Sequence, residues 1–181
     1  MSKIRIRQVY DDYCRAIRWV EATVEKVPPN PRMYVYRDIL QKEVLDFENG
    51  IELSTSTPEE TNAILEANLE SAILIDVHKQ FGGRREKEFV DKLRESQFGP
   101  VYSNDEQLGK GPTKSAFARD IQSELLLATR SKRPEIVTFD AHDIVYDLGD
   151  QKFGIECKRI HSEKQIFSRF HEACSKLQTN P

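Results

Sequence analysis

Apolar side chains recur every three to four residues along most of the first hundred positions, which is the spacing of amphipathic α-helices. This spacing predicts helices over residues 11–27, 33–47, 57–80 and 84–96, each followed by proline, glycine or a polar turn sequence that ends it. Neither an internal repeat nor a cluster of catalytic residue types occurs among them. We therefore expect residues 1–98 to form a helical region that provides structural support, self-association or binding of a protein partner.

The third of these helices has the best-defined start in the chain. Thr57 is suited to the N-cap, Pro58 to the first helical position, and Glu60 to the reciprocal acid of a capping box. Gly82-Gly83 is expected to end the helix. His78, close to that end, could ligate a metal, although a solvated or capping histidine explains it more simply.

The pattern changes after residue 98. Residues 99–112 hold three glycines and two prolines without periodicity, which predicts a linker or a substrate-facing loop. From 113 to 130 the helical spacing returns, and Glu124 falls in the middle of the apolar stripe, where a carboxylate is costly unless it is paired or bound to a cation. The alternative is a glutamate at the margin of the stripe that is bridged to Arg130 or Lys158. The stripe itself consists of Phe117, Ile121, Leu125 and Ala128.

A short β-like run at 135–139 precedes two further runs that have the composition of strands joined by a tight turn. The turn is Gly149-Asp150, and dipeptides of this kind between such runs predict a β-hairpin. A loop of two residues, or any even loop centred there, sets the register of the hairpin. One face then carries the apolar pairs Ile144 with Ile155 and Tyr146 with Phe153.

The other face of the hairpin collects charges. Asp147 is expected opposite Lys152, whereas Asp143 is expected opposite Glu156, with about 5 Å between the two Cβ atoms. Two carboxylates this close are unfavourable unless a cation lies between them, and a divalent metal would satisfy both. Lys158, two residues beyond Glu156, points from the same face. The alternative is a solvated face of alternating charges, in which Lys158 merely neutralises Glu156.

Asp143 and the triplet Glu156-Cys157-Lys158 resemble the D…(D/E)xK motif of the PD-(D/E)xK nuclease superfamily, which includes many restriction-like endonucleases. The resemblance covers roughly residues 113–178, and His142 stands where the family often has proline. It implies an α/β (α+β) fold, in which a restriction-endonuclease-like α-β-β-β-α core over residues 113–181 follows the helical region. The family usually adds a further strand, so we expect a core truncated at its C-terminus, a sheet completed from elsewhere, or a reduced version of the fold. The last helix is expected over 162–177, with an inner stripe of Ile166, Phe170, Ala173, Cys174 and Leu177.

The resemblance also implies a metal-dependent active site. Asp143, Glu156 and the backbone carbonyl of Cys157 would bind Mg²⁺, with Mn²⁺ as a substitute, and Glu124 would join directly or through water. Lys158 would orient or deprotonate the attacking water. The implied reaction is hydrolysis of phosphodiester bonds, with a DNA endonuclease as the leading hypothesis. Contacts to backbone phosphates are expected from Arg130, Lys132, Arg133, Arg159 and Lys164.

Two alternatives stay open at this point. The chain could be a catalytically inactive nuclease-like module that binds protein or nucleic acid, and RNA is as compatible with the sequence as DNA. Asp140 is a spare acid that could replace or assist Asp143, although turn chemistry also explains it.

Composition refines the partners that we expect. The net charge is −3, but residues 1–109 hold 15 basic and 20 acidic residues, whereas residues 110–181 hold 12 and 10, so the candidate catalytic part is the more basic one. No apolar run approaches the length of a membrane helix, and the N-terminus lacks a signal-peptide pattern. Three cysteines without metal-binding spacing are typical of reduced thiols. We therefore expect a cytoplasmic protein that binds nucleic acid and not membranes.

Overall fold

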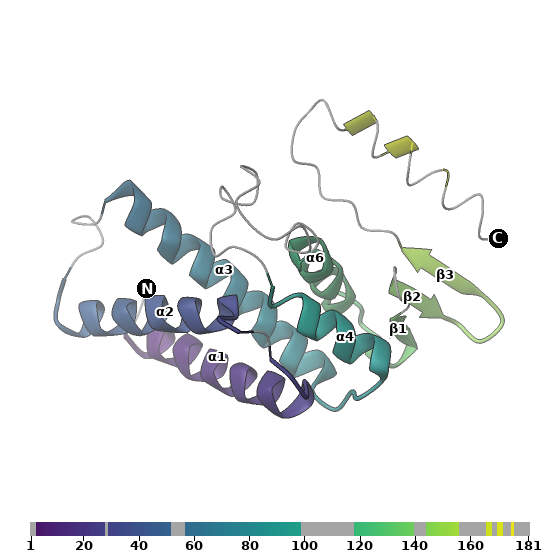
Figure 1. The fold of residues 1–181 in the computed structure, drawn as a ribbon, viewed down its shortest axis with the longest axis horizontal. Helices are drawn as coiled ribbons and strands as arrows, with labels where there is room; N and C mark the ends of the chain where they lie inside the picture. Colours follow the sequence, from purple (N-terminus) through teal and green to yellow (C-terminus); the bar gives the residue numbers. More distant parts are fainter. Residues whose placement is uncertain are drawn as a thin grey trace.

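The structure is a computed structural model that describes residues 3–27, 29–51, 57–98, 118–139 and 144–155, and in addition residues 166, 167, 170, 171 and 175. For residues 3 and 4 it describes the backbone alone. The fold is α+β and mostly helical, with one small antiparallel sheet. The described elements, labelled as in Figure 1, are α1 (Lys3–Thr23), α2 (Arg32–Glu48), α3 (Pro58–Phe81), α4 (Lys87–Glu95), α6 (Ala118–Thr129), the 3-10 turn Pro134–Ile136, β1 (Val137–Phe139), β2 (Ile144–Asp147) and β3 (Lys152–Ile155).

The helix predictions agree with the structure best where strong end signals are present. Helix α2 lies within one residue of the predicted range at each end, and α3 within one residue as well. Helix α1 was predicted to span 11–27 and this was wrong at both ends, because its apolar face continues back to Ile6 and the chain turns before the prolines. Helix α4 begins three residues later than predicted, because Arg84 leaves the helical path and donates to the Pro134 carbonyl oxygen at 2.7 Å.

The predicted capping box of α3 is confirmed. The Glu60 amide donates to Thr57 Oγ1 at 3.2 Å, and the Thr57 amide donates to Glu60 Oε2 at 3.0 Å. Both groups are exposed, so the box competes with water and stabilises the helix start by a modest amount.

Replacing Thr57 with alanine is expected to destabilise the fold by about 1 kcal/mol, because the Glu60 amide loses its acceptor. Urea unfolding followed by circular dichroism measures the change. Thr61→Ala is the matched control, since the Thr61 hydroxyl only donates to the Thr57 carbonyl oxygen within the helix. A smaller loss for Thr57→Ala than for Thr61→Ala would contradict a capping role.

One hydrophobic core joins the helical region to the strand-bearing region. Figure 1 shows α1, α2 and α3 on one side and the strands on the other, with α4 and α6 between them. The link is a cluster of aromatic rings from four elements: Phe89 on α4 lies 5.1 Å from Phe139 on β1, 5.8 Å from Phe81 on α3 and 6.2 Å from Trp19 on α1, between ring centroids. Leu125 of α6 and Ile144 of β2 belong to the same core. The position of the sheet is therefore fixed by the helices.

The hairpin register predicted from the sequence is confirmed over the described residues. The sheet has the order β1-β2-β3, and β2 pairs with β3 so that Ile144 faces Ile155, Tyr146 faces Phe153 and Asp147 faces Lys152. Gly149, with φ of 91°, occupies a backbone conformation that favours glycine, which allows the Leu148 amide to donate to the Gln151 carbonyl oxygen at 2.9 Å.

The apolar face of the hairpin is only partly covered. Ile144 is fully buried, whereas Phe153 on the edge strand is 51% exposed. The strand predicted at 135–139 is shorter than expected, because Pro134 starts a 3-10 turn and the ladder begins at Val137. The side chains of β1 and β2 are therefore more buried than those of the edge strand β3.

Two side chains of the last predicted helix are not buried as expected. Ile166 and Phe170 were predicted to face inward, but they are 42% and 66% exposed, and the prediction was wrong for both. Helical periodicity identifies an apolar face without identifying what covers it. The other residues of the predicted stripe lie outside the described residues. Among the helices that the structure describes, none combines the length and apolar character needed to span a membrane.

Candidate functional site

The charged face of the hairpin is open and carries the predicted ion pair. Lys152 Nζ lies 3.2 Å from Asp147 Oδ2, and Asp147 Oδ1 accepts a hydrogen bond of 2.9 Å from the Gly149 amide. That hydrogen bond, followed by the contact with Lys152, lowers the pKa of the Asp147 carboxyl below its ordinary value. The side chain of Asp147 is therefore engaged at the turn end of this face.

The middle of the same face has no bulky side chain. The two registers place Thr138, Val145 and Gly154 in one row across the three strands. Thr138 and Gly154 are exposed, and around the position where a Cβ of residue 154 would lie, the described structure has no atom within 4 Å. Among the described residues, no side chain therefore fills the space beside Gly154 on this row.

Most residues of the predicted active site lie outside the described residues. This applies to Asp143, Glu156, Cys157 and Lys158, and to the spare acid Asp140. It applies equally to Arg159 and Lys164, two of the predicted phosphate contacts. Within the described ranges, no group of three or more His, Cys, Asp or Glu side chains is arranged to hold a metal ion. The metal site thus stays a prediction.

Glu124 is described, and its carboxylate is paired with a buried cation from another helix. As predicted, it lies on the buried face of α6, where it is 7% exposed. Its Oε2 accepts a hydrogen bond of 2.6 Å from Lys92 Nζ on α4, and Lys92 is 5% exposed. The cation that the sequence required for this carboxylate is therefore supplied at least in part by a lysine 32 residues away along the chain.

The basic cluster at the end of α6 is exposed as expected. Arg130, Lys132 and Arg133 are all on the surface, in the segment that leads from α6 to β1. Arg133 Nε lies 3.2 Å from Glu135 Oε1, so part of its charge is neutralised locally. Arg130 and Lys132 have no ion-pair partner among the described residues. They are the better candidates for phosphate contacts.

A buried ionic cluster between α2, α3 and α6 was missed at the sequence level. Arg119 Nη1 of α6 lies 2.6 Å from Glu70 Oε1 of α3, and Arg32 Nη2 at the start of α2 lies 4.0 Å from Glu70 Oε2. All three residues are at least nine-tenths buried. Burial and the nearby Glu70 carboxylate raise the pKa of Tyr36, which accepts from Arg119, to about 12. Glu70 lies on the apolar face of α3. A carboxylate on an apolar face needs a cation, as the sequence indicates for Glu124, so the same pattern predicts a buried ion pair for Glu70.

A small polar cavity adjoins this cluster. Its volume is about 10 Å³, close to what one water molecule needs, and its lining includes Arg32, Gln122 and Ser96. Arg32 Nη2 donates to the Ser96 carbonyl oxygen at 2.6 Å, whereas its Nε and Nη1 atoms have no hydrogen-bond partner among the described residues. A single buried water is the natural ligand for such a space.

Replacing Glu70 with glutamine is expected to destabilise the fold by about 1–3 kcal/mol, because the amide keeps the shape but leaves two buried guanidinium groups without their shared carboxylate. Urea unfolding measures the loss. Glu66→Gln is the control: Glu66 Oε2 lies 3.6 Å from Arg119 Nη2 and the side chain is 23% exposed, so its loss should be smaller. An equal or larger loss for Glu66→Gln would contradict the central position of Glu70.

His78 packs against an aromatic ring and is not part of a metal cluster among the described residues. Its ring is stacked on Trp19 with 5.0 Å between centroids. Burial, followed by the charge of Arg15, lowers the pKa of His78 below its ordinary value of 6.5.

The lowered pKa of His78 predicts a loss of stability on mild acidification. The unfolded chain takes up a proton near pH 6.5, whereas the folded chain resists it, so stability is complete above that pH and falls below it until the folded pKa is reached. Thermal unfolding between pH 7.5 and 5.5, in wild type and in His78→Phe, measures this contribution. An NMR titration midpoint of His78 at or above 6.5 would contradict it.

Comparisons with protein-family models, with curated proteins and with solved structures found no match to this chain.

Proposed function

We propose that this protein is a metal-dependent nuclease, with a DNA endonuclease as the leading form, whose active site lies on the open face of the hairpin. The observation that supports the proposal is the register of the sheet. Asp147 with Lys152 and Val145 with Gly154 are paired on the charged face, as the sequence required. If the same alternation continues by one pair, it would align Asp143 with Glu156.

The register of the first two strands strengthens this proposal. Strand β1 pairs with β2 so that Phe139 faces Ile144, and the next pair in that ladder would be Asp140 with Asp143. We propose that both ladders continue by one pair and bring Asp140, Asp143 and Glu156 into one row. Three carboxylates in a row repel one another strongly, and a bound divalent cation relieves that repulsion.

The proposed donors fit Mg²⁺. Asp143, Glu156 and the Cys157 carbonyl offer oxygen atoms, which hard divalent cations prefer, and Asp147 does not compete because Lys152 already engages it. A bound Mg²⁺ supplies polarisation of the scissile phosphate and a lowered pKa of a coordinated water. The Lys158 ammonium is proposed to orient that water and to stabilise the negative charge that develops on the phosphate.

We assign Glu124 to the support of the site and not to the metal. Its carboxylate is buried and lies 2.6 Å from the Lys92 ammonium, and a second cation beside Lys92 would be repelled by it. The pair joins α4 to α6, and α4 in turn contacts β1 through Phe89 and Phe139. Glu124 would therefore hold the helices against which the sheet is packed.

The surroundings of the face are suited to a nucleic acid. Among the described residues, no atom lies within 4 Å of a Cβ placed on Gly154, and Arg130 and Lys132 are exposed on the segment before β1. Contacts from such residues to phosphates provide affinity without sequence readout. Arg159 and Lys164 are proposed to add to them.

The proposal is tested by incubating the protein with circular and linear DNA in Mg²⁺ or Mn²⁺, with EDTA as a control. Metal-dependent cutting of the circle is expected for wild type and should be lost in Asp143→Asn. Asp147→Asn is the matched control, because it removes a carboxylate from the same strand and face while leaving the proposed metal ligands in place. Cutting of linear DNA alone would indicate an exonuclease, and equal cutting by both variants would contradict the assignment of Asp143.

The second candidate function is a nuclease-like module without activity that binds protein or nucleic acid. It is favoured by the pairing of Glu124 with Lys92, which gives the acid on α6 a structural role. Calorimetry with Mn²⁺ discriminates between the two functions. Binding by wild type that is lost in Asp143→Asn supports an active metal site, whereas the absence of binding together with the absence of cutting supports the module.

A further inference from the structure

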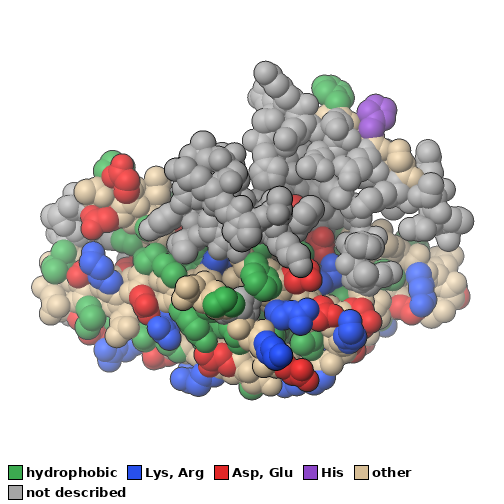
Figure 2. Space-filling model, viewed as in Figure 1, with side chains coloured by type: hydrophobic (Ala, Val, Ile, Leu, Met, Phe, Trp, Pro, Cys, Tyr) green, Lys and Arg blue, Asp and Glu red, His purple; other side chains and the backbone are tan. Residues whose placement is uncertain are grey.

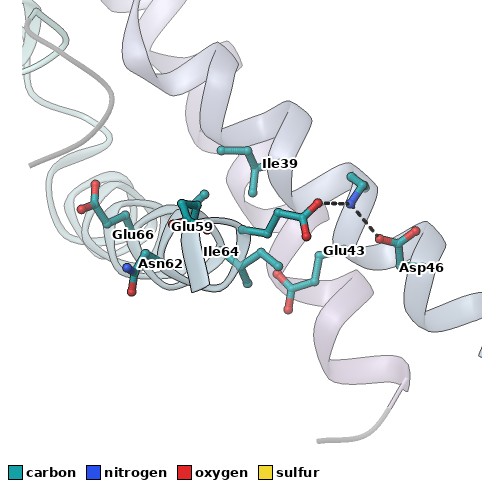
Figure 3. Close-up of a pocket in the computed structure, with 10 residues that line it drawn as sticks. Ile39, Glu43, Asp46, Glu59, Asn62, Ile64 and Glu66 are labelled. Atoms are coloured by element: carbon teal, nitrogen blue, oxygen red, sulfur yellow. Dashed lines mark ion pairs between the residues drawn. The ribbon is translucent and has the colours of Figure 1, made fainter. Parts of the chain in front are cut away.

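A groove separates the second half of α2 from the first turns of α3. Its volume is about 530 Å³, within the usual range of ligand-binding pockets. In Figure 1 the two helices diverge toward the end where α2 finishes and α3 begins, and Figure 3 shows the groove from close by. Lining residues extend over 39–46 on α2 and 59–66 on α3, which corresponds to about 10 Å, or two helical turns, on each side.

The inner part of the groove is apolar. Ile39 from α2 and Ile64 from α3 are both half-buried and point toward the space between the helices, and the small side chain of Ala63 also lines the groove. Next to the groove on α3, Leu65 and Leu69 are 63% and 61% exposed and lie one turn apart. Apolar side chains at this spacing, exposed beside a groove, are suited to contact an aliphatic partner surface.

The rim of the groove is acidic. Five carboxylates and one ammonium group line the groove, and the ammonium, Lys42 Nζ, is shared between Asp46 at 3.4 Å and Glu60 at 3.8 Å. Glu43 and Glu66 are engaged by Asn68 at 2.9 Å and by Arg119 at 3.6 Å. Figure 2 shows acidic side chains gathered where α3 begins. An occupant of this groove would meet an excess of negative charge at its entrance.

These two properties select the chemistry of the partner. A nucleic acid is excluded by repulsion between its phosphates and the acidic rim. An amphipathic helix fits, because its aliphatic face can cover Ile39 and Ile64 while its cationic side chains approach Asp46 and Glu59. We propose that the groove between α2 and α3 binds a Lys/Arg-rich amphipathic helix of a partner protein. The proposal does not depend on the nuclease activity, because the groove shares no residue with the hairpin.

The probe for this site is a synthetic, fluorescently labelled peptide of about 15 residues, long enough to form an isolated helix, with leucine at helical spacing and lysine elsewhere. Fluorescence anisotropy with the full chain measures its dissociation constant at low and high salt. Two further peptides serve as controls, one with glutamate in place of lysine and one with serine in place of leucine. We expect binding of the first peptide only, weakened by salt.

The protein variants distinguish binding of the peptide in the groove from general attraction by the net charge of the protein. Asp46→Lys combined with Glu59→Lys should weaken binding on the order of tenfold. Glu25→Lys combined with Glu95→Lys changes the net charge by the same amount at exposed positions outside the groove, and should leave binding nearly unchanged. Glu60 is not replaced, because it closes the capping box of α3. Circular dichroism confirms that each variant keeps its helices.

Several results would overturn the proposal. Equal weakening by the two double variants would show that net charge alone attracts the peptide, and equal binding of the serine peptide would show that the apolar part of the groove is not used. Binding of labelled DNA to wild type, without the peptide, that is changed by Asp46→Lys with Glu59→Lys and not by the control pair would identify a nucleic acid as the occupant. Self-association in sedimentation experiments that is lost in Asp46→Lys with Glu59→Lys would identify a second copy of the chain.

Discussion

Replacing Lys158 with alanine is expected to slow Mg²⁺-dependent cleavage of circular DNA by about 10²–10⁴-fold, the range typical of a lost proton-transfer group. In the proposed site Lys158 acts on the water and on the developing charge of the phosphate, whereas the carboxylates of Asp143 and Glu156 hold the metal. The variant should therefore keep its affinity for Mn²⁺ and lose mainly the rate of the chemical step. Single-turnover cleavage at saturating enzyme measures this rate, and calorimetry measures the metal affinity.

Lys152→Ala is the matched control for this experiment. Lys152 lies on the same face of the hairpin and pairs with Asp147, and its side chain is 70% exposed. Its removal should change cleavage by less than about twofold, since exposed ion pairs contribute little. Equal losses in both variants would show that the hairpin needs its positive charge in general. Cleavage by Lys158→Ala at the wild-type rate would remove Lys158 from the proposed mechanism.

The features of the fold that could be predicted are those specified by residues close together in the sequence. The capping box needs only Thr57 and Glu60, three residues apart, and both of its hydrogen bonds are present. The hairpin register follows from the turn at Gly149-Asp150 and from the alternation on either side of it. In both cases the local geometry leaves few alternatives, so the pattern determines the structure.

The features that could not be predicted depend on contacts between distant segments. The sequence indicated that Glu124 needs a cation and offered Arg130 and Lys158 as candidates, but no local pattern indicated Lys92, with which Glu124 forms a buried ion pair. Periodicity placed Lys92 on a short helix without indicating that the helix packs on α6. The ion pairs from Arg119 to Glu70 and from Arg32 to Glu70 likewise join three helices whose relative packing no local pattern specifies.

Packing also changes how the proposed site is understood. The sequence suggested a helical region followed by a nuclease-like core, and Phe89 and Phe81 of the helical region contact Phe139 of the first strand directly. The guanidinium group of Arg84 lies over the rings of Phe81 and Phe139 at 5.3 and 5.6 Å. A change in the helices can therefore reach the sheet, and with it the face on which the metal is proposed to bind.

Replacing Lys92 with methionine is expected to destabilise the fold by about 3–5 kcal/mol, because the Glu124 carboxylate would lose its buried ammonium partner. The two side chains are 7% and 9% exposed and lie 2.6 Å apart, so water cannot readily replace the ammonium group. Chemical unfolding measures the loss. The double variant Lys92→Met with Glu124→Leu should recover most of it, because an apolar pair of similar volume places no charged group in this buried position.

The same double variant decides the role of Glu124. If the carboxylate serves only to hold α4 against α6, the double variant should cut DNA within about tenfold of the wild-type rate once stability is restored. Mn²⁺ affinity should also stay unchanged, because the proposed ligands are on the hairpin. Restored stability together with lost Mn²⁺ binding would instead make Glu124 a metal ligand, and would mean that Lys92 only neutralises it in the metal-free protein.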